Sequence, residues 1–225
     1  DLSAHFGPAS NSSDDVYWED GFVYPYRGVS GAVHTLFEAS DGAVYVGGAF
    51  EFAGDIRAGN VARYDPVTNE WSALRGGVNG LVSSIVEGAD GRIYVGGAFS
   101  EADGVSAVGL VAWDSILGGW QPVSGAPNQA VEALLSLPDG RLAVGGAFSQ
   151  VDGIPSAGVA YYEPLAARWA SAYGGVGGRV SELYESPDGS LIAGGVLAEF
   201  GHVARLQAGS TAWESMGTGA PGPVQ

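Results

Sequence analysis

Short runs of apolar residues, separated by polar and glycine-rich turns, follow one another along the whole chain. Residues 80–88 read GLVSSIVEG, and after the turn ADG comes the apolar run RIYVGGAF, which ends at Phe99. A polar segment, SEADGVSAVG, leads to LVAWD and then to GGWQPV, which ends at Val123. No stretch shows the 3.6-residue period of an amphipathic helix. We therefore predict four β-strands in residues 80–123 and an all-β protein.

This pattern is repeated at a fixed interval of 49 residues. DGAVYVGGAF begins at Asp41, DGRIYVGGAF at Asp90, DGRLAVGGAF at Asp139 and DGSLIAGGVL at Asp188. A four-stranded sheet of this size cannot bury both of its faces alone, so the repeats must pack face to face around an axis. The repeat thus predicts a β-propeller of four-stranded antiparallel blades. We expect the Gly-Gly pair to let neighbouring sheets approach closely and the Phe to fill the space farther out.

The same interval divides the chain into blades. Four complete units are predicted at about residues 28–76, 77–125, 126–174 and 175–217, in the last of which the segment before the third strand is shorter. The sequence VYWEDGFVYPY near the N-terminus resembles a hairpin of third and fourth strands, and the C-terminal GAPGPVQ resembles the start of a first strand. We expect a single domain, residues 1–225, with five blades, in which residues 1–27 and 218–225 contribute to the closing blade. The alternative is a piece of a larger ring.

One spacing within the repeat resembles a known family. In the first copy a strand ends in Gly47-Gly48, and Tyr64 and Trp71 follow, which is the kelch pattern. The longer phrase is also similar to the kelch-related repeats of fungal cortical polarity-marker proteins and of bacterial secreted proteins, over roughly residues 28–218. The resemblance implies a propeller fold. It leaves the function open, because propellers carry many unrelated activities.

Composition narrows the classes of partner and of chemistry. The formal net charge is −16, and all nine basic residues are arginines, so nucleic acid and anionic membranes are poor partners. Cysteine is absent, which excludes disulfides, thiolate metal sites and the cysteine–tyrosine crosslink of kelch-type copper oxidases. No apolar run is long enough for membrane insertion as a helix. We expect an extracellular or cell-surface protein, or a periplasmic one, whose signal peptide has been removed before Asp1.

Candidate binding residues come first from the long loops. The loops after Phe50, Phe99 and Phe148, together with the links between blades, lie at one end of the strands, and binding residues gather on long loops of rigid scaffolds. The candidates there are Glu51, Asp55, Arg57, Asn60, Asn79, Glu101, Asp103, Asn128, Gln150 and Asp152. The repeated position of Asp103 and Asp152 is also typical of a turn residue.

A second set lies on the first strands, which line the channel of a propeller. The residue after the matched valine is His34, Ser83, Glu132 and Ser181 in successive copies. A His and a Glu that face one channel can act as an acid–base pair or as metal ligands, and they can also simply be hydrated. His202 is expected at the surface or at an edge. The acidic run SSDDVYWED lacks the spacing of a calcium loop and favours an acidic turn.

From these observations we expect a non-catalytic interaction or scaffold module that binds a protein or a glycan through its long-loop face, with no cofactor and no bound metal. Two alternatives remain open. One is a glycan-active hydrolase or lyase with its active site at the mouth of the channel, which would use His34 and Glu132. The other is a peripheral subunit of a larger assembly. No nucleophile-elbow sequence favours the first of these.

Overall fold

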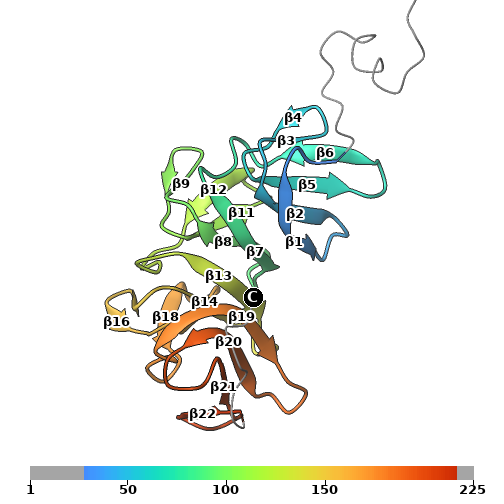
Figure 1. The fold of residues 1–225 in the computed structure, drawn as a ribbon. Helices are drawn as coiled ribbons and strands as arrows, with labels where there is room; N and C mark the ends of the chain where they lie inside the picture. The colour runs from blue at the N-terminus through green and yellow to red at the C-terminus, as the bar shows by residue number, and fades with distance from the viewer. Residues whose placement is uncertain (1–27, 217–225) are drawn as a thin grey trace, which may run out of the picture.

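The structure, a computed structural model, describes residues 28–216, which form β-strands and turns and no helix. Four antiparallel sheets of four strands each follow one another along the chain (Figure 1). The first contains β1 (Ala32–Glu38), β2 (Val44–Ala49), β5 (Val61–Asp65) and β6 (Glu70–Ala73). The second contains β7 (Leu81–Glu87), β8 (Ile93–Ala98), β11 (Leu110–Asp114) and β12 (Gly119–Pro122).

The other two sheets repeat this order. The third contains β13 (Val131–Ser136), β14 (Leu142–Gly146), β17 (Val159–Glu163) and β18 (Arg168–Ser171). The fourth contains β19 (Gly178–Glu185), β20 (Leu191–Leu197), β21 (Val203–Leu206) and β22 (Trp213–Ser215). We call the sheets blades 1 to 4. The predicted all-β fold of repeated four-stranded sheets is confirmed, and within residues 28–216 there is no helix that could cross a membrane.

The segments that the sequence pattern predicts as polar loops are short hairpins. They pair β3 (Phe52–Ala53) with β4 (Ile56–Arg57), β9 (Glu101–Ala102) with β10 (Val105–Ser106), and β15 (Gln150–Val151) with β16 (Ile154–Pro155). The prediction of plain loops is therefore wrong. In blade 2 the two-residue turn is Asp103-Gly104, with φ of 45° and 85°, which is the backbone that a tight hairpin needs. Two strand residues on each side were too few to show an alternating pattern.

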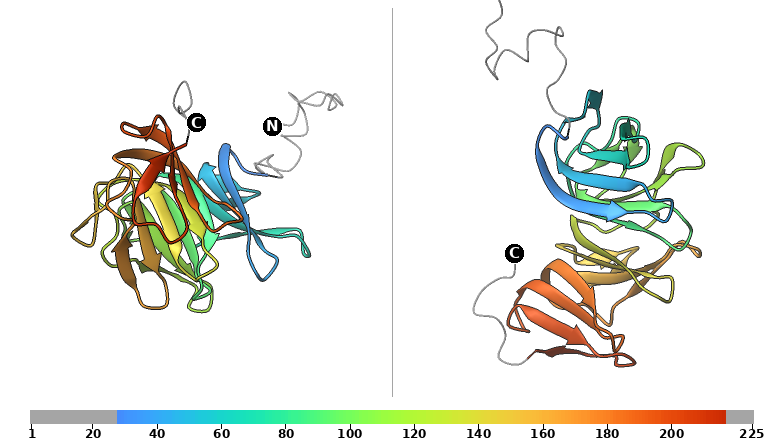
Figure 2. Two further views of the ribbon diagram at one scale, coloured as in Figure 1. Left: turned by 90° about the horizontal axis from the view of Figure 1, so that it is seen from below. Right: turned by 90° about the vertical axis from the view of Figure 1, so that its right-hand side faces the viewer.

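The core lies between neighbouring blades. One apolar cluster joins Tyr45 and Val61 of blade 1 to Val82 and Ile85 of blade 2, and the next joins blade 2 to blade 3 in the same way. Figure 2 shows the four sheets stacked face to face along an arc. This arrangement follows from the sequence, because an apolar strand covered on both faces needs a sheet on either side.

The Gly-Gly pair serves two contacts. A Cβ on Gly96 would lie 2.8 Å from Val131 Cγ1 of the next blade, and one on Gly145 would lie 2.8 Å from Val180 Cγ1. The second glycine of each pair instead lies against the first strand of its own blade, as Gly97 does against the carbonyl of Leu81. The first position thus requires glycine because neighbouring sheets approach closely. The second requires glycine because two strands of the same blade approach closely.

Blade 1 is uncovered on the side that faces away from blade 2. Val33 and Leu36 of β1 are 44% and 67% exposed, whereas the equivalent Val82 and Ile85 of β7 are 0% and 3% exposed. The difference arises because another blade covers β7, whereas no described residue covers this side of β1. The closing blade predicted from residues 1–27 and 218–225 falls outside the described residues.

Candidate binding site

The two ends of the strands differ in what they present. The short hairpins β3–β4, β9–β10 and β15–β16 lie at one end of the long strands, together with the links between blades at residues 74–80, 123–130 and 172–177. We call this end the hairpin face. At the other end, the hairpins that contain Asp41, Asp90, Asp139 and Asp188 turn through a glycine with positive φ, and each aspartate accepts the backbone N–H two residues later. Each of these aspartates is thus hydrogen-bonded within its own turn, whereas the polar side chains of the hairpin face line a cleft.

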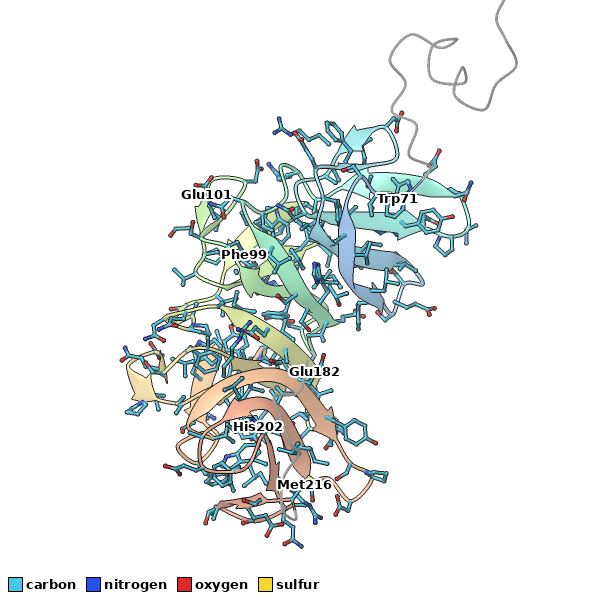
Figure 3. All side chains as sticks on the ribbon, in the orientation of Figure 1. Trp71, Phe99, Glu101, Glu182, His202 and Met216 are labelled. Carbon is cyan, nitrogen blue, oxygen red and sulfur yellow. The ribbon has the colours of Figure 1, made fainter. Side chains whose placement is uncertain are left out.

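A cleft of about 830 Å³ opens on the hairpin face between blades 1 and 2. The polar side chains that line it come from the two hairpins and from the link 74–80. They are Glu51, Arg57, Asn60, Arg75, Asn79, Glu101 and Asp103. Its walls also contain glycine backbone, at Gly59, Gly76, Gly77 and Gly104, so that a ligand can approach the main chain closely. Figure 3 labels Glu101, which lies at the hairpin end of blade 2.

The asparagines of the predicted set are occupied by the backbone. Asn60, with φ of 71°, accepts a hydrogen bond from Phe50 N at 3.1 Å and donates to Val78 O at 2.9 Å. Asn79 accepts from Ser100 N at 2.9 Å, and Asn128 holds Ser149 N in the same way at 3.1 Å. Asn79 and Asn128 fasten the base of a hairpin to the link before its blade, whereas Asn60 fastens the base of its hairpin to the link after its blade. The charged residues are therefore the available groups of the cleft.

The charged residues of the predicted set divide between the cleft and its surroundings. Arg57 pairs with Glu51 at 3.1 Å, and because both side chains are exposed this pair is weak and open to exchange with a ligand. Asp103 lines the cleft from the turn of its hairpin. Asp152 holds the same turn position in blade 3, with φ of 47° and its N–H bonded to Gly125 O at 2.8 Å. Asp55 is exposed and does not line the cleft.

The sequence pattern missed Arg75. This residue lies in the link between blades 1 and 2, has φ of 53°, and donates from Nε to Gly118 O at 2.6 Å. The signal that could have found it is its departure from the repeat, because the equivalent positions hold Ser124 and Tyr173. A side chain that the other repeats do not share is not required by the fold.

The four predicted channel residues all occupy the same irregularity of the first strands. The pairing of β1 with β2 skips one residue between Val33 and Thr35, and the skipped residue is His34. The same β-bulge falls at Ser83, Glu132 and Ser181 in the later blades. The bulge explains why the residue type at this position changes freely from blade to blade, because an extra residue has no partner across the strands.

The proposed pairing of His34 with Glu132 does not occur within residues 28–216. Glu132 Oε1 lies 2.6 Å from Arg179 Nε of blade 4, and the Glu132 side chain is 15% exposed. His34 is exposed on blade 1, and no described hydrogen bond or ion pair joins it to Glu132. Within the same residues there is no group of three or more His, Asp or Glu side chains placed to hold a metal ion. The acidic run at residues 12–20 and His5 lie outside the described residues.

The opposite end of the strands is dominated by paired charges. Arg92 Nε lies 3.2 Å from Asp114 Oδ2, and Arg141 Nη2 lies 2.6 Å from Asp139 Oδ2. The backbone N–H of Leu117, together with Arg92, lowers the pKa of Asp114. Burial, with Asp90 nearby, raises the pKa of Tyr94 far above its usual value, so this phenol stays neutral. These groups are engaged with one another, which favours a structural role for this end.

Comparison with known proteins agrees with this architecture. The model of a family described as a β-propeller domain of unknown function, DUF5122, matches residues 39–67, 88–111 and 137–164. The three matched segments start 49 residues apart, and each spans the second strand of a blade and reaches into the third. The fold is a β-propeller. No curated protein matches the sequence.

Solved structures resemble the propeller in fold alone. One is the extracellular domain of a protein described as a hybrid two-component system, BT3049 of B. thetaiotaomicron, with a TM-score of 0.55 and 12% identity over 78% of this chain. Another is the extracellular domain of BT4673 of the same organism, with a TM-score of 0.53 and 16% identity over 81% of this chain. The chain spans only 20% and 22% of the lengths of these two structures.

Proposed function

We propose that the propeller is a non-catalytic interaction module that binds a protein or a glycan in the cleft between blades 1 and 2. The observation that carries the proposal is the cleft itself, which is lined by exposed charged groups on rigid hairpins. Rigid positioning lowers the entropy that is lost on binding. The site needs neither cofactor nor metal for this role.

An extracellular, cell-surface or periplasmic location fits the proposal. The two solved structures described above are extracellular domains, and the acidic composition keeps such a module soluble. We also propose that the repeat is kelch-like. In support, Tyr64 and Trp71 stand opposite each other on β5 and β6 with ring centroids 5.0 Å apart, as do Tyr162 and Trp169 in blade 3 at 4.9 Å.

The test is a pair of matched variants. Ala49 is exposed and lines the cleft, so Ala49→Trp should occlude it. Ala98 holds the equivalent position in blade 2 and does not line the cleft, so Ala98→Trp adds the same side chain elsewhere. Wild type and both variants would be applied to arrays of purified oligosaccharides and of purified extracellular proteins.

We expect binding of at least one ligand that Ala49→Trp abolishes and Ala98→Trp preserves. Binding that survives Ala49→Trp, or the absence of any ligand on both arrays, would overturn the proposal. Any bound glycan is then incubated with the wild-type protein, and breakdown that is lost in Glu132→Gln would replace the binding role with an enzymatic one.

A further inference from the structure

The arginines of the propeller are almost all neutralised within the protein. Among residues 28–216, seven of them form ion pairs with carboxylates: Arg57, Arg63, Arg92, Arg141, Arg168, Arg179 and Arg205. Arg75 is the exception in this range, since its described partner is the carbonyl oxygen of Gly118. The chain has 25 acidic residues and nine basic ones, so an arginine without a carboxylate partner runs against the general trend.

Arg75 is also held in place. Its backbone has φ of 53°, a left-handed conformation that non-glycine residues rarely adopt, and its Nε donates a hydrogen bond to Gly118 O at 2.6 Å. The bond through Nε leaves the Nη groups with no described partner. The result is an oriented guanidinium whose outer edge can donate two parallel hydrogen bonds, the arrangement that matches a carboxylate.

The position of Arg75 puts this group inside the site. It lines the 830 Å³ cleft and also an adjoining cavity of about 240 Å³, and Asp103 lines both of them as well. No ion pair joins the two side chains, so an incoming ligand meets a donor from Arg75 and an acceptor from Asp103. The smaller cavity adds apolar surface from Val105, Leu117 and Trp120.

We infer that the cleft binds an acidic oligosaccharide whose uronate carboxylate pairs with Arg75. The inference rests on the proposed function and names its ligand. Protein interfaces are typically anchored by exposed aromatic or aliphatic side chains, but the large apolar residues that line the main cleft, Phe50 and Val78, are 4% and 3% exposed. The exposed side chain of Leu117, at 64%, lines only the smaller cavity. A polar cleft with glycine in its walls suits an oligosaccharide, whose hydroxyl groups can donate hydrogen bonds to the carboxylates of Asp103 and Glu101. Arg75 would favour an oligosaccharide that carries a carboxylate.

The probes are tetramers of galacturonate and of mannuronate, each with its methyl ester, which keeps the sugar and removes the charge. Titration calorimetry would compare wild type with Arg75→Gln, Arg75→Lys and Arg168→Gln. Arg168 is exposed and paired with Glu163 outside the cleft, so its variant controls for lost net charge. Thermal unfolding of each variant would check that the protein remains folded when the hydrogen bond to Gly118 is removed.

We expect at least one uronate tetramer to bind the wild-type protein. Its methyl ester should bind the wild type roughly tenfold or more weakly, and the acid should bind Arg75→Gln more weakly by a similar factor. Arg75→Lys should show an intermediate loss of affinity. Arg168→Gln should bind as wild type does. Failure of both uronate tetramers to bind, or equal binding of acid and ester, overturns the inference. If neutral oligosaccharides then bind in a manner that Ala49→Trp abolishes, the proposed function survives without it. Binding of a tetraglutamate peptide alone, dependent on Arg75, would assign the site to acidic protein segments instead.

Discussion

The indole Nε1 of Trp120 in blade 2 donates a hydrogen bond of 3.0 Å to the carbonyl oxygen of Leu74, which lies just beyond the last strand of blade 1. The contact is repeated around the propeller. Trp169 donates to Ser124 O and Trp213 to Ala172 O, each at 2.8 Å. The regular spacing of the tryptophans therefore has a second cause besides packing, since each one bonds to the blade before it.

Replacing Trp120 with Phe removes this donor, and Leu74 O then keeps only its hydrogen bond from Gly77 N at 3.1 Å. We expect a loss of about 0.5–1.5 kcal/mol in the free energy of unfolding, beyond the change in packing. Urea denaturation followed by circular dichroism would measure it. Trp113→Phe is the control, because Trp113 packs on Trp120 across the strands but its indole has no described hydrogen bond. Equal losses in the two variants would show that the indole bond contributes nothing.

Ser156 predicts a stabilising substitution. Its side chain is 0% exposed and its hydroxyl has no hydrogen-bond partner, whereas Ala58 and Ala107 hold the same position in blades 1 and 2. Ser156→Ala should raise the free energy of unfolding by about 1 kcal/mol, because it removes a buried group that cannot hydrogen-bond. Denaturation midpoints at equal slope would report the change.

Ser190 is the matched control for that experiment. It is equally buried, but its Oγ accepts a hydrogen bond from Arg205 Nη2 at 3.0 Å. Ser190→Ala should therefore destabilise the protein. If both alanine variants moved in the same direction, the hydrogen-bonding state of the hydroxyls would not be what distinguishes them.

Gly145→Ala tests the contact between blades 3 and 4. The added Cβ would lie 2.8 Å from Val180 Cγ1 and 3.1 Å from Leu183 Cδ1, so the blades must separate or the side chains must shift. We expect a cost of about 1–3 kcal/mol. Gly119→Ala should change little, because nothing lies closer than 3.7 Å to the Cβ it would add. Thermal unfolding of the two variants gives the comparison, and an unperturbed Gly145→Ala would contradict the close packing of these sheets.

The ion-paired aspartates predict acid sensitivity. Hydrogen bonds from Ser186 and Ser190 lower the pKa of Asp188, and the side chain of Arg141 lowers the pKa of Asp139. A group with a lowered folded pKa binds fewer protons when folded, so its stabilisation is complete above its unfolded pKa of about 3.9 and is lost as the pH falls toward the folded value.

We therefore expect the free energy of unfolding to be nearly constant between about pH 6 and 7 and to fall below about pH 4. Urea denaturation at a series of pH values would show it. Asp188→Asn should lower stability at neutral pH and flatten the acid-side slope. A slope below pH 4 that is the same in wild type and Asp188→Asn would rule out a contribution from this carboxylate.

The repeat of the sequence determined the blades, and it did so residue by residue. Asp-Gly predicted the turns, the alternating and apolar runs predicted the four long strands, and the phenylalanines Phe50, Phe99 and Phe148 are buried as expected. These features are local or recur at one spacing, so the four repeats of this one sequence can be compared with one another. The short hairpins escaped prediction because two residues cannot display a period.

The binding site depended on contacts that the sequence does not display. Arg57, Asn60 and Asp103 were predicted from loop position alone, yet the folded chain brings them to one cleft and assigns Asn60 to the backbone. Arg75 differs from the other described arginines because they are paired with carboxylates, and that pairing depends on distances between side chains that can lie far apart in the chain. Hydrophobic periodicity is a property of the sequence, whereas the pairing of charges depends on how the blades stack. Only the tertiary structure could therefore separate the polar residues that hold the fold together from those that are available to bind a ligand.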